Sequence, residues 1–131
     1  TLGNGSNEGH HPMKPARYRG IIDELVRACR QGQGQIGPRR ARAGLWNKNA
    51  TPDYLADQHQ INTLLGQLSP DQREVLAIML EQEYVGGVFE TLKVLEESEI
   101  EPFSDGYEGS PYNDFIGRLG DWKWPTDEET E

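Results

Sequence analysis

The stretch whose side chains could most plainly do chemistry is basic and contains a tryptophan. Its charged and aromatic residues are Arg39, Arg40, Arg42, Trp46 and Lys48. Cationic side chains pair with phosphates and an indole ring stacks on bases, so the pattern is typical of a site for single-stranded nucleic acid. The alternative is a basic segment held against the protein's own acidic body, with Trp46 as a buried anchor. We expect the second, because an isoelectric point of about 4.8 is unusual for a nucleic-acid-binding domain.

Two tryptophans near the end of the sequence form another candidate contact surface. Trp122 and Trp124 follow a short predicted helix that carries several apolar residues. Each large aromatic side chain buries up to about 250 Å² when it packs. The pair therefore either closes the protein's own core, which we expect, or anchors a contact with another protein or a second copy. The candidate interaction residues are thus Arg39, Arg40, Arg42, Trp46, Trp122 and Trp124.

Residues suited to metal or catalytic chemistry are sparse. His59 could share a helix face with Asp53 and Asp57, but a metal site needs three or four ligands and no His-Glu-x-x-His pattern occurs. Cys29 lies on an apolar helix face, where a buried, unreactive thiol is usual. We therefore predict no catalytic residue, no cofactor, no metal and no small-molecule substrate. The enzyme alternative requires several of these residues around one pocket: His59, Glu83, Glu90 and Asp114.

The composition narrows the class of protein. The 131 residues include 22 acids and 13 bases, for a net charge of −9, and nine of the bases lie in residues 1–48. The size favours one domain, and the acidic surface would suit a basic protein partner. We expect no membrane span and no signal peptide, since no apolar run is long enough. A single cysteine excludes an internal disulfide, so we expect a cytoplasmic protein.

Four segments have apolar residues at helical spacing. They cover residues 15–31, 51–68, 70–98 and 111–119. Helix-start signals precede the last three, namely Thr51-Pro52-Asp53, the capping box Ser69…Gln72, and Ser110-Pro111. The second and third helices should meet in a tight corner, and Gly86-Gly87 should kink the third helix or admit close packing of another helix. Because caps and periodicity agree, the sequence predicts an all-α protein.

The predicted organisation is one compact helical domain of four or five helices over residues 13–125. Four glycines and Pro38 predict a long irregular basic loop over residues 31–49. Residues 1–12, which are poor in apolar side chains, should form a flexible arm. Residues 126–131 should form a mobile acidic tail.

Two stretches resemble known families. Leu68-Ser69-Pro70-Asp71-Gln72-Arg73-Glu74-Val75-Leu76 resembles the opening of the helix-turn-helix of bacterial sigma factors, but the chain continues as apolar and acidic residues that would repel phosphate. Residues 60–125 are similar to a family of small uncharacterised bacterial helical proteins. That similarity is carried by Arg-Glu-Val-Leu-Ala, Gly-Gly-Val-Phe-Glu-Thr-Leu and Asp-Phe-Ile-Gly-Arg-Leu-Gly-Asp-Trp-Lys-Trp-Pro. It implies a helical fold and no particular activity.

The sequence thus predicts a small cytoplasmic bacterial protein that is not an enzyme and that binds another protein or itself as a homodimer. One alternative is a nucleic-acid-binding protein acting through residues 39–48. The other is an enzyme with a carboxylate pocket.

Overall fold

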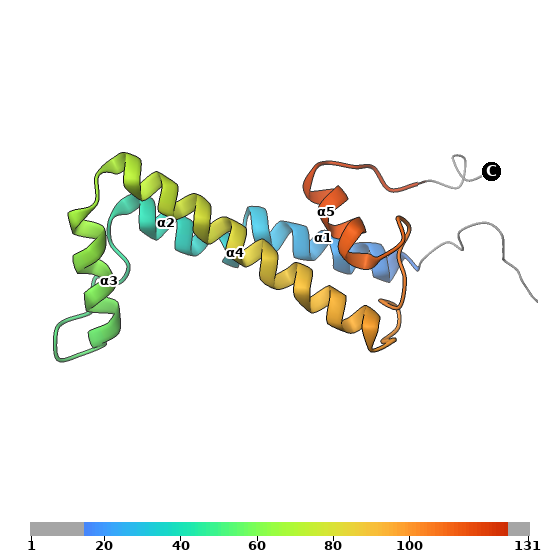
Figure 1. Ribbon diagram of the computed structural model, residues 1–131, viewed down its shortest axis with the longest axis horizontal. Coiled ribbons are helices and arrows are strands. Elements are labelled where there is room, and N and C mark those ends of the chain that lie inside the picture. Colours follow the sequence, from blue (N-terminus) through green and yellow to red (C-terminus); the bar gives the residue numbers. More distant parts are fainter. Residues whose placement is uncertain (1–14, 126–131) are drawn as a thin grey trace, which may run out of the picture. The chain divides into compact units, whose positions relative to one another are not determined.

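The computed structural model describes residues 15–125 and consists of helices and the segments that join them (Figure 1). The elements are α1 (Ala16–Arg30), a 3₁₀ turn η1 (Gln33–Gln35), α2 (Ile36–Ala43), α3 (Ala56–Gln67), α4 (Pro70–Glu97) and α5 (Pro111–Leu119). The described part of the chain has no β-strand beyond an isolated bridge between Gly106 and Gly109. The predicted all-α class is confirmed. The predicted arm and tail, residues 1–12 and 126–131, lie outside the described residues.

The chain forms two compact units. Of the described residues, unit 1 comprises 15–26 and 88–125, and unit 2 comprises Arg27–Gly87. Both boundaries fall inside helices, so α1 and α4 each contribute to both units. The domain limits at residues 13 and 125 stay a prediction. None of the described helices combines the length and the apolar character that crossing a bilayer requires.

Unit 1 is built around a buried carboxylate. Asp114 on α5 is fully buried and accepts three hydrogen bonds. They come from Tyr18 Oη on α1 at 2.6 Å, from the backbone N–H of Tyr107 at 2.8 Å and from that of Glu108 at 2.9 Å. A buried charge is tolerated when hydrogen bonds replace its water shell. Asp114 therefore ties α1 and the connection between α4 and α5 to α5. Ile22, Leu92 and Phe115 are also buried in this unit.

The core of unit 2 is small. Ala41 of α2, Leu65 of α3 and Ala77 of α4 are its buried apolar centre. Half-buried side chains pack around that centre, namely Trp46, Ile61, Leu68, Leu76 and Leu80. Two of the three central residues are alanines, so the buried centre of this core contains little apolar side-chain volume.

The junction of α3 and α4 forms as predicted. The Ser69 hydroxyl accepts from the Gln72 backbone N–H at 3.1 Å, and Gln72 Oε1 accepts from the Ser69 backbone N–H at 2.9 Å. This reciprocal pair is a capping box, which satisfies two N–H groups that a helix start would otherwise leave unbonded. The tight corner between the two helices is confirmed.

The predicted start of the preceding helix is wrong. The helix α3 begins at Ala56, five residues after Thr51. Thr51 Oγ1 accepts from the Tyr54 backbone N–H at 3.0 Å, and the backbones of the two residues also bond to each other. A threonine hydroxyl can close such a local turn in place of capping a helix. The chain then enters α3 through Leu55, which is left-handed at φ 57°.

The predicted loop over residues 31–49 is wrong at its centre. Residues 33–35 form η1, and α2 follows directly. Pro38 is the third residue of α2, where a missing N–H breaks no helical bond. Gly44, at φ 77°, ends the helix. The basic residues Arg39, Arg40 and Arg42 therefore lie on a helix and not on a loop.

The start of α5 differs in one detail from its prediction. Ser110 is the N-cap residue, but its hydroxyl makes no capping bond. It donates instead to Glu96 Oε2 at 2.7 Å, which joins the end of α4 to the start of α5. Gly86 and Gly87 lie inside α4, which continues through them as a helix.

Candidate protein-binding groove

A hydrogen-bonded asparagine holds the one tryptophan of unit 2. Asn62 Oδ1 on α3 accepts from the backbone N–H groups of Trp46 and Asn47 at 2.7 and 3.1 Å, and Asn62 Nδ2 donates to the Asn47 carbonyl at 2.7 Å. Asn47 Nδ2 in turn donates to Gln58 Oε1 at 2.6 Å. The segment after α2 is therefore fixed to α3, and with it the direction in which the Trp46 ring projects.

Glycines lie beneath the two aromatic rings of unit 2 that face α2 and η1. A Cβ added at Gly37 would be 3.3 Å from Cη2 of Trp46, and one added at Gly34 would be 2.9 Å from Cδ1 of Tyr84. The Gly34 position is also 2.9 Å from the Cα of Cys29, so a side chain there would require the backbone to move. These two glycines let the rings lie close against the backbone of η1 and α2.

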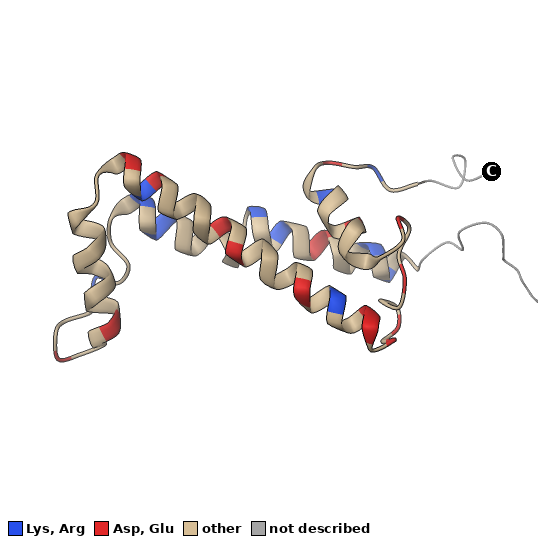
Figure 2. Cartoon of the chain, in the orientation of Figure 1, with Lys and Arg blue, Asp and Glu red and all other residues tan. Residues whose placement is uncertain are grey.

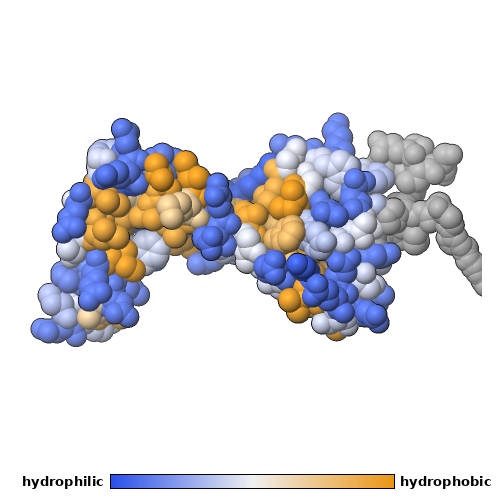
Figure 3. Space-filling model, viewed as in Figure 1, coloured by the Kyte–Doolittle hydropathy of each residue, from blue (hydrophilic) through white to orange (hydrophobic). Residues whose placement is uncertain are grey.

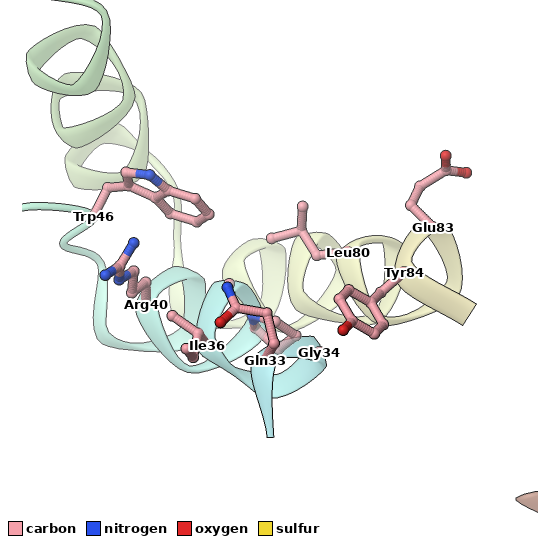
Figure 4. A pocket seen from close by; sticks show the side chains of 10 residues that line it. Gln33, Gly34, Ile36, Arg40, Trp46, Leu80, Glu83 and Tyr84 are labelled. Atoms are coloured by element: carbon pink, nitrogen blue, oxygen red, sulfur yellow. The ribbon is translucent and has the colours of Figure 1, made fainter. Parts of the chain in front are cut away.

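Between the rings runs an open groove of about 350 Å³, whose exposed surface is mainly apolar. Figure 4 shows Trp46 at one end, Tyr84 at the other, and Leu80 between them on α4. The remaining lining residues are Gln33, Gly34, Ile36, Gly37, Pro38, Arg40 and Glu83. We call this site the groove. Its volume lies near the lower end of the range for ligand pockets.

Opposite charges stand at the two ends of the groove. The Arg40 guanidinium lies over the Trp46 ring, 5.4 Å from its centroid, which is cation–π distance. Glu83 adjoins Tyr84 on α4 at the other end (Figure 4). The Trp46 end of the groove therefore carries a cation, and Glu83 lines the Tyr84 end with its carboxylate directed away from the Tyr84 ring (Figure 4).

Of the predicted interaction residues, the structure brings Arg40 and Trp46 together at this groove. Arg39 is exposed on α2 and does not line it. Arg42 faces α4, where its Nε and Nη2 donate to the two carboxylate oxygens of Glu74 at 2.8 and 3.0 Å, and Nη2 lies 3.8 Å from Glu81. The hydrogen bond to Glu74 raises the pKa of Arg42, and the same bond lowers the pKa of Glu74. Figure 2 shows these basic positions on α2 and acidic positions on α4.

Trp122 and Trp124 pack inside unit 1. Their ring centroids are 5.2 Å apart, and Trp124 also contacts the rings of Tyr107 and Tyr18 at 5.2 and 6.1 Å. Trp124 Nε1 donates to Asp23 Oδ2 at 2.9 Å. The two tryptophans thus pack within the protein itself, which is the first of the two alternatives that the sequence offers. A contact of either tryptophan with a partner stays a prediction.

Arg118 also joins α1 to the segment that contains the two tryptophans. Arg118 Nε donates to Asp23 Oδ1 at 2.7 Å, its Nη1 donates to the Trp122 carbonyl, and its guanidinium lies 5.4 Å from the centroid of the Trp124 ring. One carboxylate on α1 thus holds both α5 and the chain that follows it. The sequence singles out the two tryptophans, but it does not predict that Asp23 bonds to Trp124 and to Arg118.

The residues named for the enzyme alternative do not share the groove. Glu83 lines it, whereas His59, Glu90 and Asp114 do not. Over residues 15–125 no group of three or more metal-binding side chains is arranged to hold an ion. Cys29 is buried, and burial raises the pKa of its thiol, which disfavours the reactive thiolate.

Sequence reasoning missed several residues of the site. In the sequence Tyr84 and Leu80 are ordinary positions of an apolar helical stripe, and Ile36 lies in the segment predicted to be a loop. Asn62 carried no signal that set it apart from other polar helix residues. The one local signal was the repeated glycines at 34 and 37, which indicate a close approach of other groups to the backbone.

Comparison with known proteins identifies a family. No curated protein and no solved structure matches the chain significantly. Residues 13–126 match the family of unknown function DUF6547. This match confirms the resemblance to an uncharacterised family and extends it toward the N-terminus from residues 60–125. The chain therefore belongs to the family of unknown function DUF6547.

Proposed function

We propose that this chain is a non-enzymatic protein-binding module whose groove accepts a segment of another protein. The observation that carries the proposal is the Arg40–Trp46 pair at the end of a mainly apolar groove. Tryptophan and arginine are the residue types most often found as energetic anchors of protein interfaces.

The charges favour a partner segment of a particular kind. Its centre would be apolar, to cover Leu80 and Ile36. An acidic residue would lie toward Arg40 and a basic residue toward Glu83. Since Arg42 is already engaged with Glu74, it adds little free positive charge for a phosphate backbone, which is why protein is the first choice and nucleic acid the second.

Site-specific photo-crosslinking tests the proposal. A benzoylphenylalanine residue replaces Gln33 in the groove or, as the matched control, the exposed Gln60 on α3 outside it. Both chains are irradiated in the cells that produce them. We expect a protein adduct from position 33 and not from position 60. We also expect Arg40→Glu to abolish it, because a reversed charge at an exposed position alters recognition without removing core contacts.

The same experiment has outcomes that contradict the proposal. Equal adducts from both positions, no adduct from position 33, or an adduct indifferent to Arg40→Glu would remove the groove as a protein site. An adduct that nuclease digests, and whose yield falls steeply with added salt, would favour the nucleic-acid alternative instead.

A further inference from the structure

Unit 2 exposes a second apolar surface, away from the groove. Leu64 on α3 is 50 % exposed, and Val75, Ile78 and Met79 on α4 are 58, 41 and 55 % exposed. Figure 3 shows hydrophobic side chains gathered over α3 and the first half of α4. We call these four residues the apolar face. Single exposed apolar residues are common in soluble proteins, but a contiguous patch marks a contact surface.

The spacing on α4 is that of a helix that packs against another helix. Val75, Ile78 and Met79 stand at i, i+3 and i+4, on the side of α4 away from Leu76 and Ala77, which pack into the core. Gly86 continues the same side three turns after Val75. No heavy atom lies within 4 Å of the place that its Cβ would take. A helical glycine costs about 1 kcal/mol relative to alanine, and here it leaves room for a second backbone to approach.

We propose that the apolar face binds a second copy of this chain, with the two α4 helices antiparallel about a two-fold axis near Ile78 and Met79. In this alignment Ile78 of each copy lies against Met79 of the other, and Val75 lies against Gln82. A two-fold contact needs a surface that is complementary to itself. The apolar face meets this need, because its centre is uncharged and the only polar side chain placed against it is the long, neutral Gln82.

The charge balance of unit 2 fits a copy of itself better than a strongly charged partner. Unit 2 holds seven basic and six acidic residues, and no charged residue belongs to the apolar face. Glu74 and Glu81, which border the face on α4, are already paired with Arg42. The described part of unit 1 contains eleven acidic and five basic residues. A symmetric contact through unit 1 would therefore bring negative charges of the two copies together, and they would repel each other.

The apolar face shares no residue with the groove. The dimer therefore does not rest on the proposed function, and either can fail without the other.

Solution mass tests the dimer. Sedimentation or light scattering of the full chain over about 1 to 200 µM should show the mass rise from 14.8 kDa toward twice that value. Ile78→Glu should weaken association by about tenfold or more, because it places a charge in the apolar centre. Ile116→Glu is the matched control, since Ile116 is 43 % exposed in unit 1, and it should leave the mass curve unchanged. Circular dichroism confirms that both variants remain helical.

A cysteine pair tests the arrangement. In a Cys29→Ala background, Met79→Cys should be joined into covalent dimers by a short bismaleimide. Val94→Cys, whose side chain is exposed to the same 55 % but lies in unit 1, should not. A monomer at every concentration, an Ile78→Glu chain that still dimerises, or equal cross-linking from position 94 would each overturn the proposal.

Discussion

At the scale of the residue, Asp114 is the group on which unit 1 most depends. Replacing it with alanine removes the acceptor of the hydrogen bonds from the Tyr18 hydroxyl and from the backbone N–H groups of Tyr107 and Glu108. We expect Asp114→Ala to lower the free energy of unfolding by about 3 kcal/mol or more, and Tyr18→Phe by about 1 kcal/mol. Urea unfolding at neutral pH measures both. Equal losses would show that the Tyr18 bond is the only one of the three that matters.

Tyr18 also makes stability depend on alkaline pH. Burial, with the hydrogen bond and charge of Asp114, raises the pKa of Tyr18 well above its ordinary value near 10. Above pH 10 the unfolded chain therefore loses this proton while the folded chain keeps it. Its contribution is complete below the unfolded pKa and is lost as pH rises, by about 1.4 kcal/mol per pH unit.

The measurement is a comparison of unfolding free energies between about pH 9 and 11 for the natural chain and for Tyr18→Phe. The natural chain should lose stability more steeply. Parallel curves would mean that Tyr18 ionises as easily in the folded chain as in the unfolded one.

At the scale of the element, the two predicted serine caps should respond differently to substitution. Ser69→Ala removes one bond of the capping box and should cost about 1 kcal/mol, and Ser69→Asp should restore most of it because aspartate is also a good N-cap. Ser110→Ala should leave capping of α5 unchanged and loosen the link to Glu96 instead. Thermal unfolding followed by circular dichroism tests this. A Ser69→Asp chain no more stable than Ser69→Ala would contradict a capping role.

Two glycines of unit 2 should also respond differently to substitution, because one has open space beside it and the other does not. Gly86→Ala meets open space and should stabilise the monomer by about 1 kcal/mol, through better helix propensity. Gly34→Ala forces a Cβ against the backbone of Cys29 and should destabilise by about 1 to 3 kcal/mol. Both are measured at low concentration, where self-association does not contribute. A destabilised Gly86→Ala chain would mean that α4 is not a regular helix at that point.

The helices themselves were largely predictable, and the exceptions have local causes. The Ser69–Gln72 box, the α3–α4 corner and the end of α5 follow from short-range chemistry that a sequence displays directly. The start of α3 does not, because a threonine hydroxyl serves a turn as readily as a helix cap. The sequence does not predict α2, because Gly37 and Pro38 disfavour a helix at most positions, although here both lie in its first turn, where neither breaks a hydrogen bond.

At the scale of the whole molecule, charge is distributed unevenly between the two units. The excess of acids in unit 1 should repel itself at low ionic strength, whereas unit 2 is nearly balanced. Raising sodium chloride to about 0.5 M should therefore increase the melting temperature, since salt screens this repulsion. A lower melting temperature in salt would show that ion pairs such as Arg118–Asp23 contribute more than the repulsion does.

The groove illustrates what a sequence cannot display at this scale. The sequence displays Arg40 and Trp46 as a cation near an aromatic residue, because they are close in the chain. Their partners Leu80, Glu83 and Tyr84 come from another helix, and only tertiary packing brings them to α2. The pairing of Asp23 with Trp124, 101 positions away, was beyond short-range reasoning for the same reason.

The placement of the three tryptophans gives each half of the protein its own optical reporter. The two indoles of Trp122 and Trp124 meet nearly edge to face at 62°, close enough for their electronic transitions to couple and produce a paired band in the circular dichroism spectrum. Trp46 belongs to unit 2 and lies beneath the Arg40 guanidinium, and it supplies an emission signal of its own once the other two tryptophans are changed to phenylalanine. Unfolding can be followed by the circular dichroism of the Trp122–Trp124 pair in the natural chain and by the fluorescence of Trp46 in that variant. Comparing the two transitions would reveal whether unit 1 and unit 2 unfold together or in succession.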